Sequence, residues 1–194
     1  MTVLEPPKGS ALPKRRRVYT TADLEEMPHD ARYELIRGEL YPMPNNSAEH
    51  GNKTALVSAY VTVFVEQHNL GKCFAAETRF VVEENPDTTI APDFAFISNS
   101  RQIVIPPTGY LRIAPDLVVE TRSPSDRRRA FALKIVQWLS AGSQVVWAVE
   151  PSSKTLTIHS KGANPQTLSI DDTLTEENLL PGFALPLSKI FDAA

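Results

Sequence analysis

Two carboxylates stand at the borders of short apolar segments, where a charged side chain needs a partner. Asp93 directly follows Pro92 and begins an apolar segment, and Glu120 ends the run Leu117-Val118-Val119. Charged groups are seldom fully buried unless they pair with an opposite charge or coordinate a metal. The positions of the two acids therefore indicate that a cation lies between them. The alternative is that each is an ordinary surface or turn residue, which is common for an acid beside a strand.

A lysine on the following predicted helix is the candidate partner of these acids. The apolar residues of this segment repeat at helical spacing and would form its inward face: Phe131, Ile135, Trp138 and Leu139. Lys134 lies on the flank of that face. Its ammonium would either reach the carboxylates or extend along its stem to solvent.

Apolar periodicity and turn signals place the elements that would position these residues. Helices are predicted over residues 21–27, 48–68 and 126–141, the last starting at Ser123-Pro124-Ser125-Asp126 and closed by Gly142. The stripe in the second helix, closed by Gly71, consists of Ala55, Leu56, Ala59, Tyr60, Val63, Phe64 and Gln67. A hairpin is predicted over residues 33–43, and strands over residues 78–82, 93–97, 117–121, 145–149, 156–159 and 167–170. This order predicts an α/β or α+β fold, one sheet with helices packed on it.

Several short motifs, in order along the chain, resemble the putative restriction endonuclease family of bacteria. They are Tyr33-Glu34-Leu35, Gly38-Glu39-Leu40, Ala91-Pro92-Asp93, Pro115-Asp116-Leu117-Val118-Val119-Glu120, Ser123-Pro124-Ser125-Asp126, Lys134, Ala141-Gly142, Val145-Val146-Trp147 and Leu180-Pro181-Gly182-Phe183. Each motif is weak alone, but their ordered combination, from about Val18 to Phe191, is specific.

The resemblance implies the restriction endonuclease-like fold, a central mixed sheet flanked by helices, with a metal site of the PD-(D/E)XK type. Asp93 and Glu120 match its two acids. A lysine usually stands two residues after the second acid, where this chain has Arg122, so Lys134 is identified as the substitute. Arg122 would then bind the scissile phosphate or point outward from its strand.

The same resemblance implies further site residues and a cofactor. Glu34 matches an acid of the first hairpin and His50 a histidine before the long helix, with a surface strand residue and a local hydrogen bond as the alternatives. Asp93, Glu120 and Glu34 would hold Mg²⁺ or Mn²⁺, which prefer oxygen ligands. His50 would assist proton transfer, and the run Arg127-Arg128-Arg129 would contact DNA phosphates, unless it is only a solvated face.

Net charge, cysteine content and hydropathy limit the class of protein and its location. The 194 residues carry a net charge of −3 and a single cysteine, and no stretch is long and apolar enough for a membrane helix. We expect a cytoplasmic protein with no membrane partner, with a flexible basic tail over residues 1–17 and a nuclease-like domain over 18–192. The expected function is metal-dependent DNA endonuclease, acting as a homodimer by analogy. The alternative is a nucleic-acid-binding or accessory module with the nuclease fold and little activity.

Overall fold

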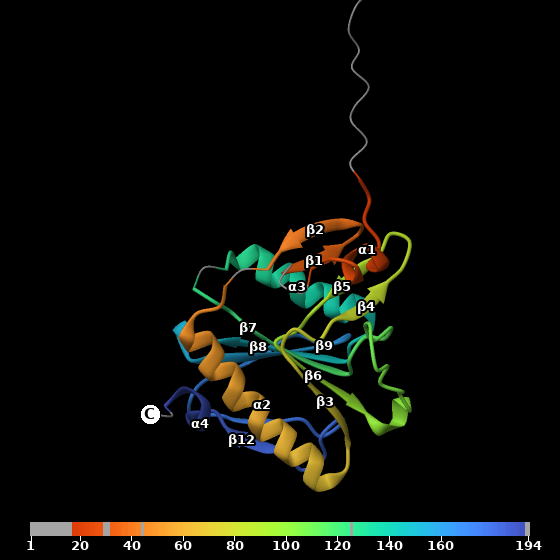
Figure 1. The fold of residues 1–194 in the computed structure, drawn as a ribbon. Coiled ribbons are helices and arrows are strands. Elements are labelled where there is room, and N and C mark those ends of the chain that lie inside the picture. The colour runs from red at the N-terminus through yellow and green to blue at the C-terminus, as the bar shows by residue number, and fades with distance from the viewer. Residues whose placement is uncertain (1–16, 29–31, 44, 125, 193–194) are drawn as a thin grey trace, which may run out of the picture.

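A six-stranded mixed sheet forms the centre of the fold in the computed structural model, which describes residues 17–28, 32–43, 45–124 and 126–192 (Figure 1). The strand order is β10-β9-β8-β7-β6-β3, and only β7 and β8 pair in parallel. The strands are β3 (Gly71–Ala75), β6 (Phe94–Ser98), β7 (Leu117–Thr121), β8 (Val145–Glu150), β9 (Thr155–Ser160) and β10 (Gln166–Leu168).

The parallel pair β7–β8 determines where the helix that carries Lys134 lies. Parallel neighbours need a crossover connection, which α3 (Arg128–Ala141) provides. Its buried residues Phe131, Ile135 and Trp138 pack on one face of the sheet against residues such as Val118 and Val146. This packing holds α3 against β8 and its neighbour β7, the strand of Glu120.

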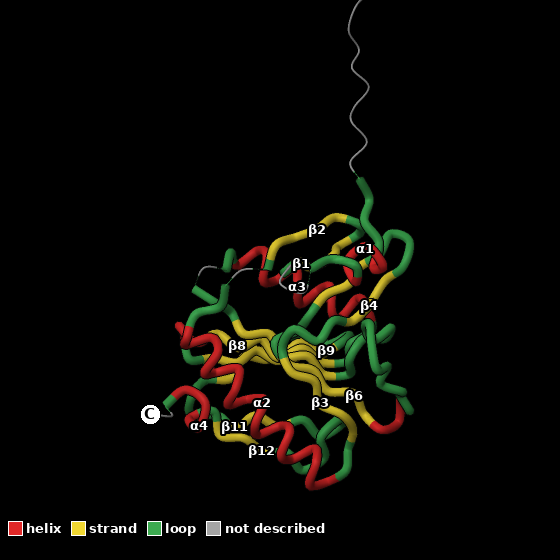
Figure 2. Tube along the Cα trace, viewed as in Figure 1, coloured by secondary structure: helices red, strands yellow, loops and turns green. Residues whose placement is uncertain are grey.

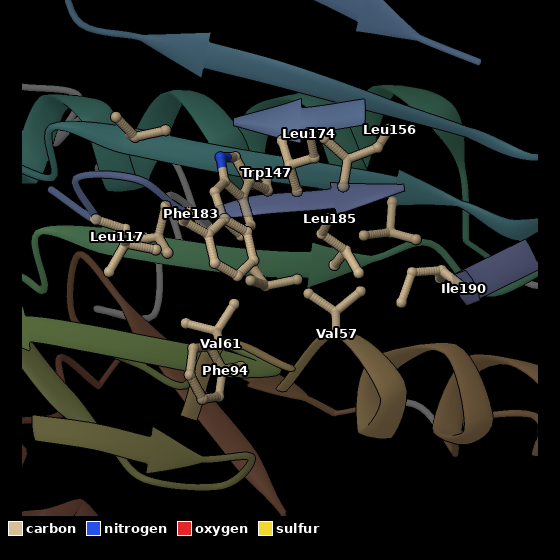
Figure 3. Close-up of a cluster of buried hydrophobic side chains, with 14 of the residues drawn as sticks. Val57, Val61, Phe94, Leu117, Trp147, Leu156, Leu174, Phe183, Leu185 and Ile190 are labelled. Carbon is tan, nitrogen blue, oxygen red and sulfur yellow. The ribbon is translucent and has the colours of Figure 1, made fainter. Parts of the chain in front are cut away.

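The other face of the sheet is covered by α2 (Ala48–His68) and by the end of the chain (Figures 1 and 3). The terminal elements are β11 (Thr173–Thr175), β12 (Ala184–Pro186) and α4 (Ser188–Phe191). At the centre of this layer Trp147 stacks on Phe183, with ring centroids 5.9 Å apart.

A smaller antiparallel sheet packs beside α3, in the order β2-β1-β5-β4. Its strands are β1 (Tyr33–Ile36), β2 (Glu39–Pro42), β4 (Phe80–Glu83) and β5 (Thr88–Ile90), and α1 (Thr21–Glu25) precedes them. Short 3₁₀ turns, η1 (Asn99–Arg101) and η2 (Pro151–Ser153), follow β6 and β8. Figure 2 shows how strands and helices separate into these layers. The segment 91–93 leads from the small sheet into β6 of the large one.

The predicted fold class is confirmed: helices flank a central mixed sheet. The hairpin, the helix over residues 48–68 and the strand over residues 117–121 lie where they were predicted. The short strands β3, β5, β11 and β12 and the helix α4 were not predicted.

Three local predictions were wrong. The helix predicted from about residue 126 begins at Arg128, but the predicted Ser or Asp cap does not form: the N-cap is Arg127, without a side-chain capping bond, and the Asp126 carboxylate accepts the amide hydrogen of Ser123. The long helix ends at Asn69, in the left-handed conformation, and not through Gly71. Of its predicted apolar stripe, only Leu56 and Phe64 pack against the core, and both are partly buried. The buried residues of the helix are His50, Lys53, Thr54, Val57, Val61 and Val65.

The predicted tail over residues 1–17 lies outside the described residues except for Arg17, so the division into tail and domain stays a prediction. Within the described part of the chain, no helix is long and apolar enough to cross a membrane.

Candidate active site

Four elements bring three carboxylates and one lysine together. Glu34 lies on β1, Asp93 just before β6, Glu120 on β7 and Lys134 on α3. The ammonium of Lys134 lies 3.2 Å from Glu34 Oε1 and 3.2 Å from Glu120 Oε2. Of the two orientations considered from the sequence, the structure therefore has the one in which the lysine reaches the carboxylates.

The strand register explains why Asp93 and Glu120 meet. Phe94 of β6 pairs with Val119 of β7, so the residue before Phe94 and the residue after Val119 lie at the same end of the antiparallel pair. The link over residues 91–93 also touches the first hairpin, because the amide of Ala91 donates a hydrogen bond to Glu34 Oε1 at 3.3 Å. The small sheet thus supplies Glu34 to a site built on the large sheet.

Glu120 is the most deeply buried acid of the group, with 3 % of its surface exposed. Its Oε1 accepts a hydrogen bond from the indole of Trp138 at 2.7 Å. Burial, followed by repulsion from Asp93 and Glu34, raises the pKa of Glu120 to about 8 against the opposing effect of Lys134. Additional positive charge would stabilise the ionised form of this carboxyl group.

Lys134 is held within the site by one hydrogen bond and two ion pairs. Its ammonium donates to the backbone oxygen of Ala91 at 3.2 Å and forms ion pairs with Glu34 and Glu120. Although burial opposes its charge, the carboxylates of Glu120, Glu34 and Asp93 hold the pKa of Lys134 above its ordinary value. The residue is therefore a fixed cation that also orients the two glutamates.

Asp93 is oriented by two donors on one of its oxygens. Oδ2 accepts the amide hydrogen of Thr121 at 2.7 Å and lies 3.0 Å from Nε2 of His50. An N–H at Nε2 of His50 can donate to this carboxylate oxygen, and the other ring nitrogen is Nδ1. That Nδ1 is buried and has no hydrogen-bond partner within the described part of the chain. The geometry makes His50 a partner of Asp93 rather than a local cap of its own helix.

The donor chemistry of the site suits a hard divalent cation. Three carboxylates face one ammonium, and the described residues offer no hydrogen-bond donor to Asp93 Oδ1 or Glu34 Oε2. Among the described residues, no group of three or more Asp, Glu, His or Cys side chains is placed so that all of them could hold one metal ion. Magnesium sites commonly use one or two carboxylates and complete the shell with water and substrate oxygens, so an open arrangement fits such an ion.

The cluster opens into a cavity of about 450 Å³ between the first hairpin and α3. Its polar lining includes Glu34, His50, Asp93, Glu120 and Lys134. Hairpin residues such as Tyr41 and Met43 and helix residues such as Leu133 form apolar walls around this group. The site is therefore open to a ligand from one side.

The predicted phosphate-binding arginines lie apart from the cluster. Arg122 pairs with Glu150 of β8 at 2.7 Å and is not part of the cavity lining. The run Arg127-Arg128-Arg129 is exposed at the start of α3 and forms no ion pair with the residues that the structure describes. Ser125, in the predicted helix start, lies outside the described residues.

Sequence reasoning missed two contributors to this site. Trp138 was assigned to the inward face of its helix, but its indole also holds Glu120. Tyr41 was not singled out, although it pairs with Glu34 across the hairpin and lines the cavity. Strand alternation was the available signal, because residues paired across a hairpin share one face of the sheet.

Comparisons with known proteins identify the fold and the family of the chain. A crystal structure of a putative nuclease belonging to DUF820 from Anabaena variabilis ATCC 29413 matches with a TM-score of 0.77 at 20% identity, covering 89% of this chain and 97% of that one. At this identity the match shows the fold. No curated protein matches the chain. The family model described as "Putative restriction endonuclease" (Uma2) matches residues 21–188, so the chain belongs to this family, and a nuclease function is supported.

Proposed function

We propose that this protein is an endonuclease that hydrolyses DNA phosphodiester bonds with Mg²⁺ or Mn²⁺. The observation that carries the proposal is the lysine held between two glutamates, beside a third carboxylate, at an open cavity. Surface ion pairs rarely combine three acids from separate elements with one largely buried lysine. Such perturbed clusters in a cavity are typical of functional sites.

Asp93, Glu120 and Glu34 would hold the divalent cation. When bound, the ion supplies Lewis acidity and positive charge at the scissile phosphate. Mg²⁺ and Mn²⁺ fit because every candidate ligand atom is a carboxylate oxygen.

The chain's own residues then prepare the site around the phosphate. Lys134 keeps Glu34 and Glu120 in place and adds a fixed positive charge, which needs little reorganisation when negative charge develops. Trp138 orients Glu120, and His50 orients Asp93 through their hydrogen bonds. We therefore assign His50 to positioning rather than to the proton transfer expected from the sequence.

Contacts to the rest of the DNA backbone are assigned to Arg127, Arg128 and Arg129. They are exposed, have no acidic partner in the described structure and lie at the start of the helix that carries Lys134. Phosphate binding draws on such clustered cations. The charge of Arg122 is already balanced by Glu150, which makes it the weaker candidate.

The test is Mn²⁺-dependent cleavage of supercoiled, linear and single-stranded DNA at low salt. We expect the wild type to cut and both Asp93→Ala and Lys134→Met to lose cleavage. Lys154→Ala is the matched control, because Lys154 forms an exposed ion pair with Asp192 and does not line the cavity. Cleavage retained by both site variants would refute this site. Salt-dependent DNA binding by an inactive wild type would support the alternative, a binding module with the nuclease fold.

The expected homodimer and cytoplasmic location remain proposals. Enzymes that cut both strands commonly act as symmetric dimers. Light scattering of the purified chain, with and without DNA, measures the assembly directly, and a monomer in both conditions would contradict the dimer.

A further inference from the structure

Tyr41 stands beside the carboxylate cluster because of the hairpin register. Glu34 of β1 and Tyr41 of β2 are directly paired, and side chains paired in this way lie on the same face with Cβ atoms about 5 Å apart. Tyr41 is 46 % exposed, and its hydroxyl donates to Glu39 Oε2 at 3.2 Å. An aromatic side chain thus lines the cavity next to a candidate metal ligand.

The opposite wall of the cavity is one stripe of α3. The stripe consists of Ala130, Leu133, Lys134 and Gln137, which are spaced at helical intervals and all line the cavity. Leu133 is 56 % exposed, although it is a large aliphatic side chain next to Lys134. The cavity that holds the charged cluster is therefore also lined by an aromatic side chain from the hairpin and an aliphatic one from α3.

Apart from the proposed metal, the described residues of the cavity lining offer a phosphate no cation that is not already paired with an acid. Its lining contains four acids, Glu34, Asp93, Glu120 and Asp126, against Lys134 and Arg32. Lys134 forms ion pairs with Glu34 and Glu120, and Arg32 forms one with Glu77 at 3.1 Å. A flat, uncharged group suits the space between Tyr41 and Leu133 better than an anion does.

In a nucleic acid, the flat uncharged group next to a phosphate is the base. Inside a duplex the bases are stacked and paired, so a duplex would present its sugar-phosphate surface to these walls. An unpaired base can instead stack on an aromatic side chain, a contact that tolerates any base. The cavity of about 450 Å³ is of a size that holds one small ligand group.

We propose that Tyr41 and Leu133 hold an unpaired base beside the scissile phosphate, so that the preferred substrate is single-stranded or locally unpaired nucleic acid. This inference rests on the proposed nuclease function and specifies its substrate class. Tyr41 acts through its ring, because its hydroxyl is directed to Glu39.

The direct test is binding of a short single strand that contains the fluorescent base 2-aminopurine, with Ca²⁺ in place of the catalytic metal so that the strand stays intact. Stacking on Tyr41 quenches the emission. We expect Tyr41→Ala to weaken single-strand binding about tenfold and to abolish the quenching, while Tyr41→Phe keeps both. Tyr60→Ala is the matched control, since Tyr60 is 38 % exposed on α2 and does not line the cavity.

Cleavage kinetics provide the second readout. Tyr41→Ala should raise KM for single strands about tenfold with little change for duplex, and Leu133→Ala should act in the same direction. Cleavage that is equal on both substrates and insensitive to Tyr41 would overturn the inference and leave the nuclease assignment intact. Absence of both binding and cleavage in the wild type would refute the nuclease function and the inference together. If Tyr41→Ala or Leu133→Ala instead converts a dimer into a monomer, the two walls form an interface between copies, and the inference is wrong.

Discussion

His50 Nε2 is hydrogen-bonded to Asp93 Oδ2, and substitutions of His50 can show whether it positions Asp93 or transfers a proton. His50→Ala should lower cleavage roughly 10–100-fold, the usual effect of losing a residue that orients a metal ligand. His50→Gln can place an amide donor near the same carboxylate and should recover much of the loss. The measurement is cleavage rate as a function of pH.

The shape of that pH profile is decisive for His50. A positioning residue leaves it unchanged in the Gln variant, whereas a proton-transfer residue would remove one limb of the profile. Inactivity of His50→Gln at every pH, with Mn²⁺ still bound, would contradict the positioning role.

Cys73 on β3 provides a pH test of packing that is independent of the site. Burial raises the pKa of its thiol from 9.0 to about 11, so less of the reactive thiolate is present at a given pH. At pH 8 we expect alkylation by iodoacetamide to be about a hundredfold slower than for a thiol of ordinary pKa, with the rate rising until the pH approaches 11. The unfolded protein in guanidinium is the control, and equal rates in both states would contradict the predicted burial.

At the scale of elements, the start of α3 combines features that oppose helix stability. Its N-cap, Arg127, makes no side-chain capping bond, the first turn contains no acid, and Arg128 and Arg129 place positive charge at the positive end of the helix dipole. Arg127→Asp should therefore raise the free energy of unfolding by about 1 kcal/mol, as measured by urea denaturation.

The same substitution should weaken DNA binding if the arginine run contacts phosphates. We expect lower affinity and a slope of log K against log salt that is smaller by about one. A variant that is more stable with an unchanged salt dependence would show that the run is only a solvated face.

The elements with apolar periodicity could be predicted from the sequence, and those without it could not. The apolar run of β7 and the inward residues of α3 were enough to locate Glu120 and Lys134 on neighbouring elements. On α2 the prediction of the buried face was wrong, because Lys53 and Thr54 point inward while Val63 is exposed. Where the end of a helix packs against a polar site, its buried residues are polar, so the apolar pattern of the sequence does not show which face is buried.

The site residues also differ in whether the sequence pattern alone could predict them. Asp93 and Glu120 stood out at strand borders, but Glu34 and His50 were identified only through the family resemblance. Their places depend on contacts between distant segments, such as Ala91 to Glu34, that residue spacing does not encode. Short strands such as β5 were missed because three residues carry too little pattern.

At the scale of the whole molecule, the end of the chain completes the core on the α2 side. Eight of the 20 buried members of this cluster lie at or after Leu174, including Phe183 against Trp147 (Figure 3). Phe183→Ala should reduce the free energy of unfolding by about 3–5 kcal/mol in urea denaturation. Val63→Ala, at an exposed position of α2, should change it by less than about 0.5 kcal/mol. A similar small effect of Phe183→Ala would contradict the packing of the terminal elements on the sheet.

The division of the site between two sheets has a consequence for how specificity can diverge. Asp93, Glu120 and Lys134 belong to the large sheet and its crossover helix, whereas Glu34 and Tyr41 arrive together on the first hairpin. If the proposed base contact is correct, replacing this hairpin while keeping glutamate at position 34 should change which nucleotides bind and leave the residues of the large sheet and α3 in place.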